Sequence, residues 1–244
     1  MRNRLLGRVG CGRRYAISVK TGRLAAEIGG TVVAFGLALF LAAGTADWLA
    51  GWAFLALFFA FTVSLSGWLF RRNPGLLVER MTGIGKPDQP RWDKVFFVVV
   101  EALFMTWLVL MPLDAVRFHW SRMPGFLQVA GALLLIGSFY LFFLTFRENP
   151  YLSPAVRVQA ERGQSVISTG PYHYVRHPMY AAVMPFIAGT SLLLGSWCGL
   201  LYGLILMACI AFRAVREERV LQLELPGYAA YMAQVHYRLI PHVW

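Results

Sequence analysis

Charged residues are scarce in this sequence. Of its 244 residues, 14% are charged, against roughly 25% in soluble domains, and 58% are hydrophobic. This composition excludes an ordinary water-soluble domain and places the chain among membrane proteins. Acidic residues are scarcer than basic ones: 12 Asp and Glu stand against 23 Lys and Arg, which gives a net charge of +11. Because the basic residues flank apolar segments, we expect the lipid bilayer as partner and no nucleic acid.

The motifs of several enzyme classes are also missing. The three cysteines, Cys11, Cys198 and Cys209, have neither CxxC nor metal-ligand spacing, and we expect reduced structural thiols. No His/Cys/Asp cluster predicts a metal, and no Ser-His-Asp or Cys-His arrangement is readable. No GxGxxG follows a strand, so a soluble nucleotide-binding fold is not indicated.

Long apolar runs, by contrast, are frequent. About 20 apolar residues cross a bilayer core of roughly 30 Å, and four segments meet this length: 24–44, 48–69, 95–113 and 125–146. The uncharged run 178–212 would span about 52 Å as one helix, which overshoots the bilayer. Pro185, Gly189 and the Gly195-Ser196 pair supply break points, so we expect two short helices joined near Gly195.

This layout predicts an all-α, polytopic membrane helix bundle with four spanning helices and a C-terminal helix-turn-helix hairpin. One membrane face then receives segments 1–23, 71–94, 147–177 and 213–244. Together they hold all but two of the 23 Lys and Arg residues, the exceptions being Arg117 and Arg122. The positive-inside rule places this face, with both termini, in the cytoplasm. The membrane would be the inner membrane of a bacterium or the endoplasmic reticulum of a eukaryote.

Two polar segments bracket the predicted hairpin. The first, 163–180, reads GQSVISTGPYHYVRHPMY and is broken by glycine and proline. Pro178 suits the first residue of a helix, and the free N–H groups there, beside Arg176 and His177, suit an anion. The alternative is an interfacial loop anchored in lipid headgroups.

In the second segment, 213–231, Arg213 and Glu217 lie one turn apart on one helix face. They form either a solvated ion pair or a site in which the acid holds a cofactor and the arginine holds an anionic substrate. Glu101 lies inside the third predicted span, where a carboxylate is costly. It is either functional or reaches the interface.

The first segment, with R-x-x-x-E-E-x-x-L at 213–221 and the later GYAAYMAQVHYRLIP, resembles the integral-membrane methyltransferases. This family includes isoprenylcysteine carboxyl methyltransferases and phospholipid N-methyltransferases, and the resemblance covers residues 140–241. Together with the basic segment and the apolar runs, it predicts a basic cytoplasmic tail (1–23), a four-helix membrane region (24–146) and a catalytic region (147–244). It also implies S-adenosylmethionine as cofactor, in a cytoplasmic pocket between the loop and the last helices.

The implied cofactor contacts are Gln159, Gln164, Val166, Ile167, Tyr172, His177, Pro178, Met179, Tyr180 and either Glu217 or Glu218, because a one-residue shift aligns either acid. Gln164 stands where the isoprenylcysteine enzymes carry His, and its spacing from Gln159 is shorter than theirs. Arg213 matches the position implied to bind substrate and to act in catalysis.

Methyl transfer from a sulfonium is an in-line displacement, so the enzyme mainly aligns donor and acceptor. A carboxylate acceptor needs no general base, whereas an amine must lose a proton and suits a neighbouring arginine poorly. The sequence therefore favours carboxyl O-methylation of a lipophilic or prenylated, isoprenylcysteine-like acceptor over phospholipid N-methylation. The alternatives are an NADPH-dependent sterol-type reductase, whose YRIIP-like tail resembles residues 237–241, and a non-catalytic membrane protein on the same fold.

Overall fold

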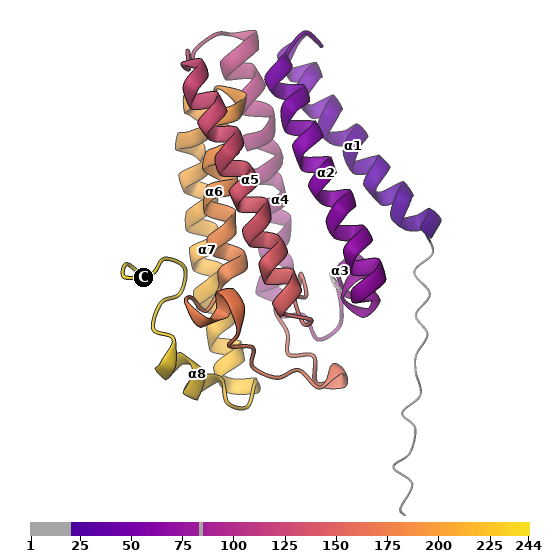
Figure 1. Ribbon diagram of the computed structural model, residues 1–244, viewed down its shortest axis with the longest axis vertical. Helices are drawn as coiled ribbons and strands as arrows, with labels where there is room; N and C mark the ends of the chain where they lie inside the picture. Colours follow the sequence, from indigo (N-terminus) through magenta and orange to yellow (C-terminus); the bar gives the residue numbers. More distant parts are fainter. Residues whose placement is uncertain (1–20, 83–84) are drawn as a thin grey trace, which may run out of the picture.

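The computed structural model describes residues 21–82 and 85–244, which form a bundle of helices (Figure 1). Its elements are α1 (Thr21–Ala43), α2 (Leu49–Arg72), α3 (Pro74–Thr82), α4 (Arg91–Pro112), the π-helical turn η1 (Leu113–Arg117), α5 (Gly125–Glu148), the 3-10 turns η2 (Ala160–Arg162) and η3 (Gly170–His173), α6 (Pro178–Leu194), α7 (Trp197–Glu224) and α8 (Tyr228–Gln234). Helical residues make up 75% of the structure, and the described residues contain no strand. The predicted all-α membrane bundle is confirmed. Of the predicted basic tail, residues 1–20 lie outside the described part.

Within residues 21–82 and 85–244, five helices are long and apolar enough to cross a membrane: α1, α2, α4 with its π-helical end, α5 and α7. The first four match the four predicted spans. The run 178–212 is broken at Gly195, as predicted, because this residue ends α6 with a left-handed φ of 81°. Ser196 then caps α7 by accepting a hydrogen bond from the Gly199 amide at 2.7 Å. The hairpin is therefore α6 followed by α7, and Pro185 stays inside α6.

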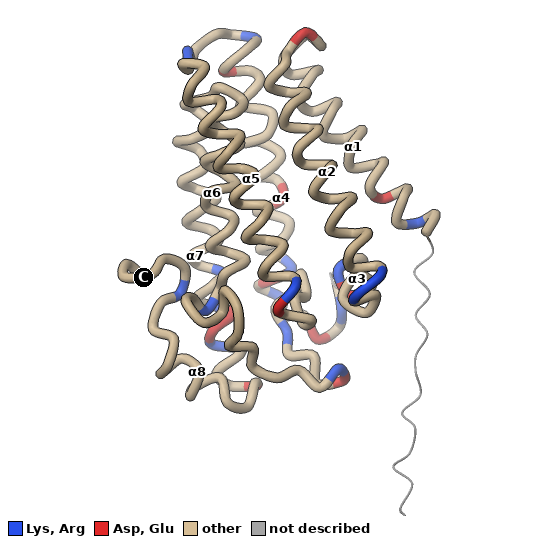
Figure 2. Tube along the Cα trace, viewed as in Figure 1, with Lys and Arg blue, Asp and Glu red and all other residues tan. Residues whose placement is uncertain are grey.

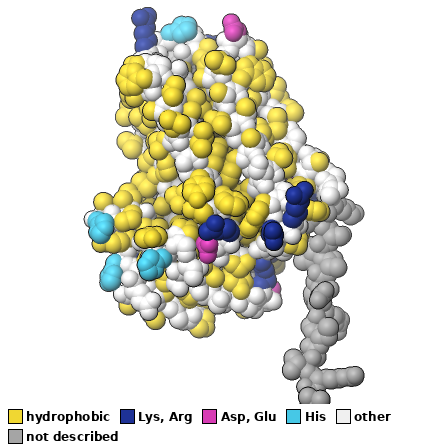
Figure 3. Space-filling model, viewed as in Figure 1, with side chains coloured by type: hydrophobic (Ala, Val, Ile, Leu, Met, Phe, Trp, Pro, Cys, Tyr) yellow, Lys and Arg dark blue, Asp and Glu magenta, His cyan; other side chains and the backbone are white. Residues whose placement is uncertain are grey.

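Charged residues gather at one end of the bundle, around α3, α8 and the segment between α5 and α6 (Figure 2). The start of α1 and the C-terminus lie toward this same end. Between the two ends the surface carries mostly hydrophobic side chains (Figure 3). An apolar belt with charges at its rims is the distribution that a bilayer requires of a spanning protein. The chain is a multi-pass membrane protein.

Close backbone packing holds α6 against α5. A Cβ atom on Gly131 would lie 2.5 Å from the main-chain nitrogen of Leu193, and one on Gly189 would lie 2.8 Å from that of Leu135. Small residues allow such approach between membrane helices, where dispersion contacts replace the hydrophobic effect. This contact fixes the position of α6 and of the polar loop that precedes it.

A buried tryptophan joins α4 to α7. Trp107 is fully buried, and its indole N–H donates to the Gly199 carbonyl at 2.8 Å. Since α4 and α7 run side by side, the start of α4 meets the last turns of α7. Asp93 is thereby brought to Arg213, with 3.3 Å between Oδ1 and Nη2.

We expect Gly131→Ala to lower the melting temperature of the detergent-solubilised protein, because the added methyl group meets backbone that cannot move aside independently. Overpacking of this kind costs about 1–3 kcal/mol. Gly137→Ala, on the same helix with nothing within 4 Å of the new Cβ, is the matched control for helix propensity. Equal melting temperatures in the two variants would show that α5 and α6 do not depend on this contact.

Candidate active site at the charged end of the bundle

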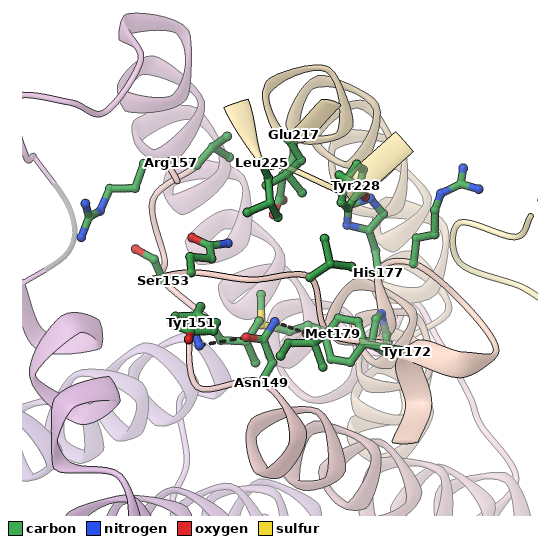
Figure 4. A pocket seen from close by; sticks show the side chains of 18 of the residues that line it. Asn149, Tyr151, Ser153, Arg157, Tyr172, His177, Met179, Glu217, Leu225 and Tyr228 are labelled. Atoms are coloured by element: carbon green, nitrogen blue, oxygen red, sulfur yellow. Dashed lines mark hydrogen bonds between the residues drawn. The ribbon is translucent and has the colours of Figure 1, made fainter. Parts of the chain in front are cut away.

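A cavity of about 820 Å³, including its open mouth, lies at the charged end of the bundle. Figure 4 shows Glu217 and Tyr228 on one side of the cavity, across from Asn149 and Met179. The walls come from the α5–α6 segment, the start of α6, the end of α7, and α8.

The hairpin thus brings the two polar segments of the sequence together. The predicted site residues that line the cavity are Gln164, Val166, Ile167, Tyr172, His177, Pro178, Met179, Tyr180, Arg213 and Glu217. Gln159 and Glu218 do not line it. Arg213 and Glu217 thus line the same cavity as Tyr172 and His177.

The two adjacent acids of α7 face different surroundings. The Tyr180 hydroxyl donates to Glu217 Oε2 at 2.5 Å, and this carboxylate lies in the cavity wall. Glu218 is buried behind the wall and accepts from Arg176 Nε at 2.6 Å and from Arg238 Nε at 2.7 Å. Successive helical residues point about 100° apart, so only one of the pair can face a ligand. That residue is Glu217.

Glu218 joins three segments that are distant in sequence. Besides its bond to this carboxylate, Arg176 donates to the two carbonyls of 235–236 at 2.8 Å each. The main-chain N–H of His177 donates to the Arg238 carbonyl at 2.9 Å. The loop before α6, the end of α7 and the C-terminal segment are therefore locked together. The sequence suggested that Arg176 would suit an anionic ligand. In the structure its N–H groups instead bind Glu218 and two main-chain carbonyls of the protein itself.

Gln159 shapes the loop behind the cavity. The residue is fully buried, and its side-chain amide donates to the Tyr151 carbonyl at 2.6 Å. Its own main-chain N–H donates to Gln164 Oε1 at 2.7 Å. Gln164 reaches the cavity and Gln159 holds it there.

Several polar groups in the wall have no partner among the described residues. The buried Tyr228 hydroxyl makes no hydrogen bond, and the main-chain N–H groups of Val166 and Ile167 make none either. Burial raises the pKa of Tyr228, so its hydroxyl is neutral at pH 7 and available as a donor. Buried polar groups are rarely left unpaired. The buried Tyr228 hydroxyl therefore fits a polar ligand with hydrogen-bonding edges, whereas Val166 and Ile167 are only half-buried.

A second aromatic pair supports this wall. The Tyr231 hydroxyl donates to the Tyr172 carbonyl at 2.7 Å, and Asn149 Nδ2 donates to the Tyr172 hydroxyl at 2.8 Å. Burial raises the pKa of both tyrosines. These contacts tie α8 and the end of α5 to the turn before α6.

Arg213 is held rigidly at the membrane side of the cavity. Its Nη2 donates to the Pro154 carbonyl and forms the ion pair with Asp93, while its guanidinium lies 4.5 Å from the Phe97 ring centre and 5.3 Å from that of Phe96. Its buried Nε has no hydrogen-bond partner among the described residues. The group is therefore fixed in orientation, and its Nε–H is left without a partner.

An ionic cluster closes the side of the cavity next to α3. Arg157 binds Glu79 at 3.1 Å, Asp88 at 2.8 Å and Glu161 at 2.7 Å, and Glu79 also pairs with Lys86 at 2.5 Å. Burial acts against these charges, but the hydrogen bonds outweigh it: they raise the pKa of Arg157 and lower that of Glu79. The cluster stays charged at pH 7 and fastens the α3–α4 loop to the α5–α6 segment.

Sequence reasoning did not single out Asp93, Asn149, Tyr151 or Tyr228. The GYAAY stretch that contains Tyr228 belonged to the resemblance and was the one available signal. Asp93 and Asn149 act only through tertiary contacts, so no local pattern marks them.

The fold and the cavity define a polytopic membrane protein with a ligand site at its charged rim. Residues 126–224 match the family model described as phospholipid methyltransferase (PEMT). This stretch includes every cavity-lining residue except Leu225, Tyr228 and Tyr231. The resemblance expected from the sequence is thus confirmed over this stretch: residues 126–224 are similar to the membrane methyltransferases that include the phospholipid and isoprenylcysteine enzymes. No curated protein matches the chain.

We expect Glu218→Gln to destabilise the protein by about 3 kcal/mol, because breaking one partner of a buried ion pair leaves uncompensated charge. Residues 235–244 should become susceptible to proteolysis at the same time. Both effects are measured by thermal unfolding and limited digestion in detergent. Glu224→Gln, an exposed acid on the same helix, is the control. Equal stability and equal proteolysis in the two variants would show that Glu218 does not hold the C-terminal segment in place.

Proposed function

We propose that the cavity binds S-adenosylmethionine and that the enzyme methylates a carboxylate on a lipophilic, isoprenylcysteine-like acceptor. One observation carries the proposal: Glu217 and Arg213, one helical turn apart, line the same cavity at the boundary between the charged rim and the apolar belt. A ligand in this cavity would therefore have both a carboxylate and a guanidinium in its surroundings. The broader activity, that of a membrane methyltransferase without a specified acceptor, is supported by the family match of residues 126–224.

The residues of the wall fit the cofactor. The Glu217 carboxylate suits ribose hydroxyls or the amino group, and the unpartnered N–H groups of Val166 and Ile167 suit a base edge. Tyr228 offers a neutral hydroxyl, and His177 stands at the cap of α6, where an anion such as the cofactor carboxylate is favoured. When bound, S-adenosylmethionine supplies an electrophilic methyl group on a sulfonium.

Arg213 would orient the acceptor carboxylate through its free Nε, as charge-assisted hydrogen bonds do. Asp93 and the two phenylalanine rings hold the guanidinium still, so little reorganisation is needed during reaction. Asp93 is a positioning residue in this scheme. No general base is required, because the acceptor is already an anion. An ammonium acceptor would meet the positive charge of Arg213, which disfavours N-methylation.

The distribution of Lys and Arg supports the orientation proposed for the chain. The charged rim with the cavity and both termini would face the cytoplasm, where a soluble cofactor is available. Residues 147–244 then form the catalytic region and 24–146 the membrane region. The acceptor would arrive from the bilayer.

Isothermal titration of the purified protein with S-adenosylmethionine and with NADPH tests the proposal. Binding of the first alone supports it. Binding of NADPH alone would instead support a sterol-type reductase, and binding of neither would support a non-catalytic protein on this fold.

Glu217→Gln should weaken S-adenosylmethionine binding about 10-fold, because the variant loses charge-assisted hydrogen bonds to the ligand. Glutamine keeps an acceptor for the Tyr180 hydroxyl, so the fold is spared. Titration calorimetry measures the affinity, with Glu224→Gln as control. An unchanged affinity would remove Glu217 from the cofactor site.

Arg213→Lys should lower kcat by on the order of 100-fold, since the acceptor carboxylate would be misplaced. The affinity for S-adenosylmethionine should stay near the original value, because Arg213 is assigned to the acceptor. A methyl-transfer assay and titration calorimetry give the two quantities. Equal losses in both would mean that Arg213 only supports the fold.

A further inference from the structure

A second hollow opens within the apolar belt beside the candidate active site. This cleft, of about 1,020 Å³ including its open part, lies between α1, α2, α3 and α5. Its lining is largely apolar, from Leu69 and Leu77 at the charged end to Phe61 and Phe142 farther along the bundle. Met179 forms part of both this cleft and the cofactor cavity. The cleft and the cavity therefore lie next to each other, with Met179 in the wall of both.

One cation, Arg80 on α3, lines this cleft without a counter-ion. Its guanidinium lies 4.8 Å from the Phe146 ring centre, and the one hydrogen bond that it makes to a described residue, the Leu152 carbonyl, is long at 3.3 Å. No acid of the described residues pairs with it, and residues 1–20 and 83–84 contain no Asp or Glu. The other charged residue of the lining, Glu27, is paired with Arg23 at 2.8 Å.

The charge of the proposed catalytic arginine also acts on Arg80. Burial and, after it, the positive charge of Arg213 lower the pKa of Arg80 to about 10, so Arg80 remains charged at pH 7. Arg80 lines the cleft and Arg213 lines the neighbouring cavity. Since Asp93 already pairs with Arg213, the uncompensated charge there is that of Arg80. An unpaired cation among apolar side chains is costly, and an anionic ligand would offset this cost.

We propose that Arg80 binds the anionic head of the methyl acceptor, a single-chain carboxylate lipid whose tail occupies the cleft. The inference rests on the proposed function and names its substrate class. In the reaction a carboxylate oxygen forms the bond to the methyl carbon, the carbon–sulfur bond breaks with its electron pair going to sulfur, and no proton moves.

The change of charge in this reaction explains why a carboxylate suits Arg80. The carboxylate is attracted to Arg80 before transfer, whereas the ester product is neutral and loses that attraction. The product can then return to the bilayer. A phospholipid would keep its phosphate charge after N-methylation and would stay paired with Arg80, and it would bring a second chain to one cleft.

The test is binding of radiolabelled palmitate to the full-length protein in phosphatidylcholine nanodiscs. Arg80→Gln should weaken palmitate binding at least about 10-fold, as loss of a charge-assisted pair does, and Arg80→Lys should retain most of it. Arg72→Gln, the same charge change at the exposed end of α2, should bind as the original protein does. Equal palmitate affinity in Arg80→Gln and the original protein would overturn the proposal.

A comparison of ligands tests the same point without any variant. The original protein should bind palmitate at least about 10-fold more tightly than methyl palmitate, because only the acid pairs with the guanidinium. Equal affinities would contradict the assignment. Dipalmitoyl phosphatidate binding that depends on Arg80, with palmitate binding that does not, would assign the cleft to phospholipids and overturn the single-chain carboxylate.

Titration of S-adenosylmethionine into the same samples separates the two proposals. Arg80→Gln should keep its cofactor affinity, because Arg80 does not line the cofactor cavity. Arg80-dependent palmitate binding in a protein that does not bind S-adenosylmethionine would support the lipid site and overturn the proposed function. Cofactor binding together with palmitate binding that is insensitive to Arg80 would overturn this inference alone.

Discussion

The buried carboxylate of Glu218 is the interaction on which the geometry of the site depends. It pairs with Arg176 and Arg238 and so joins the loop before α6, the end of α7 and the C-terminal segment. In a region of low dielectric such a cluster holds only while every charge is paired. Its position also sets the rotation of α7. With Glu218 fixed inward, helical geometry turns its neighbour Glu217 toward the cavity.

The bilayer explains why the fold could be predicted from the sequence. A membrane core tolerates neither charges nor unpaired backbone, so apolar length and the placement of Lys and Arg determined the spans. The run 178–212 was too long for one crossing, and Gly195 could adopt the left-handed φ that ends α6. Each of these signals is local in sequence or set by the membrane. For the same reason the predicted spans and the observed helices agree.

The site could be predicted only where it is built from contiguous sequence. The stretch 164–180 supplies most of one wall, and a motif marks it. Glu217 and Glu218 could not be told apart, because the choice depends on how α7 is rotated against the loop. That Gln159 lies behind the cavity wall could not be predicted either, because its position depends on the path of the loop. Arg80, on a short helix in a different part of the chain, reaches the site region only through tertiary packing.

Negative and positive side chains lie on opposite sides of the site. Glu217 faces the cavity on the side of α8, whereas Arg213 lies against Phe96 and Phe97 at the apolar belt, and Arg80 lies in the lipid-side cleft. A cationic donor is therefore favoured on the side of the charged rim and an anionic acceptor on the side of the apolar belt. In the proposed reaction these two charges cancel, and fixed groups that are already oriented would stabilise that change at little reorganisation cost. An amine acceptor would reverse the sign needed on the membrane side, where two guanidinium groups stand, and this polarity is the physical reason to favour the carboxylate.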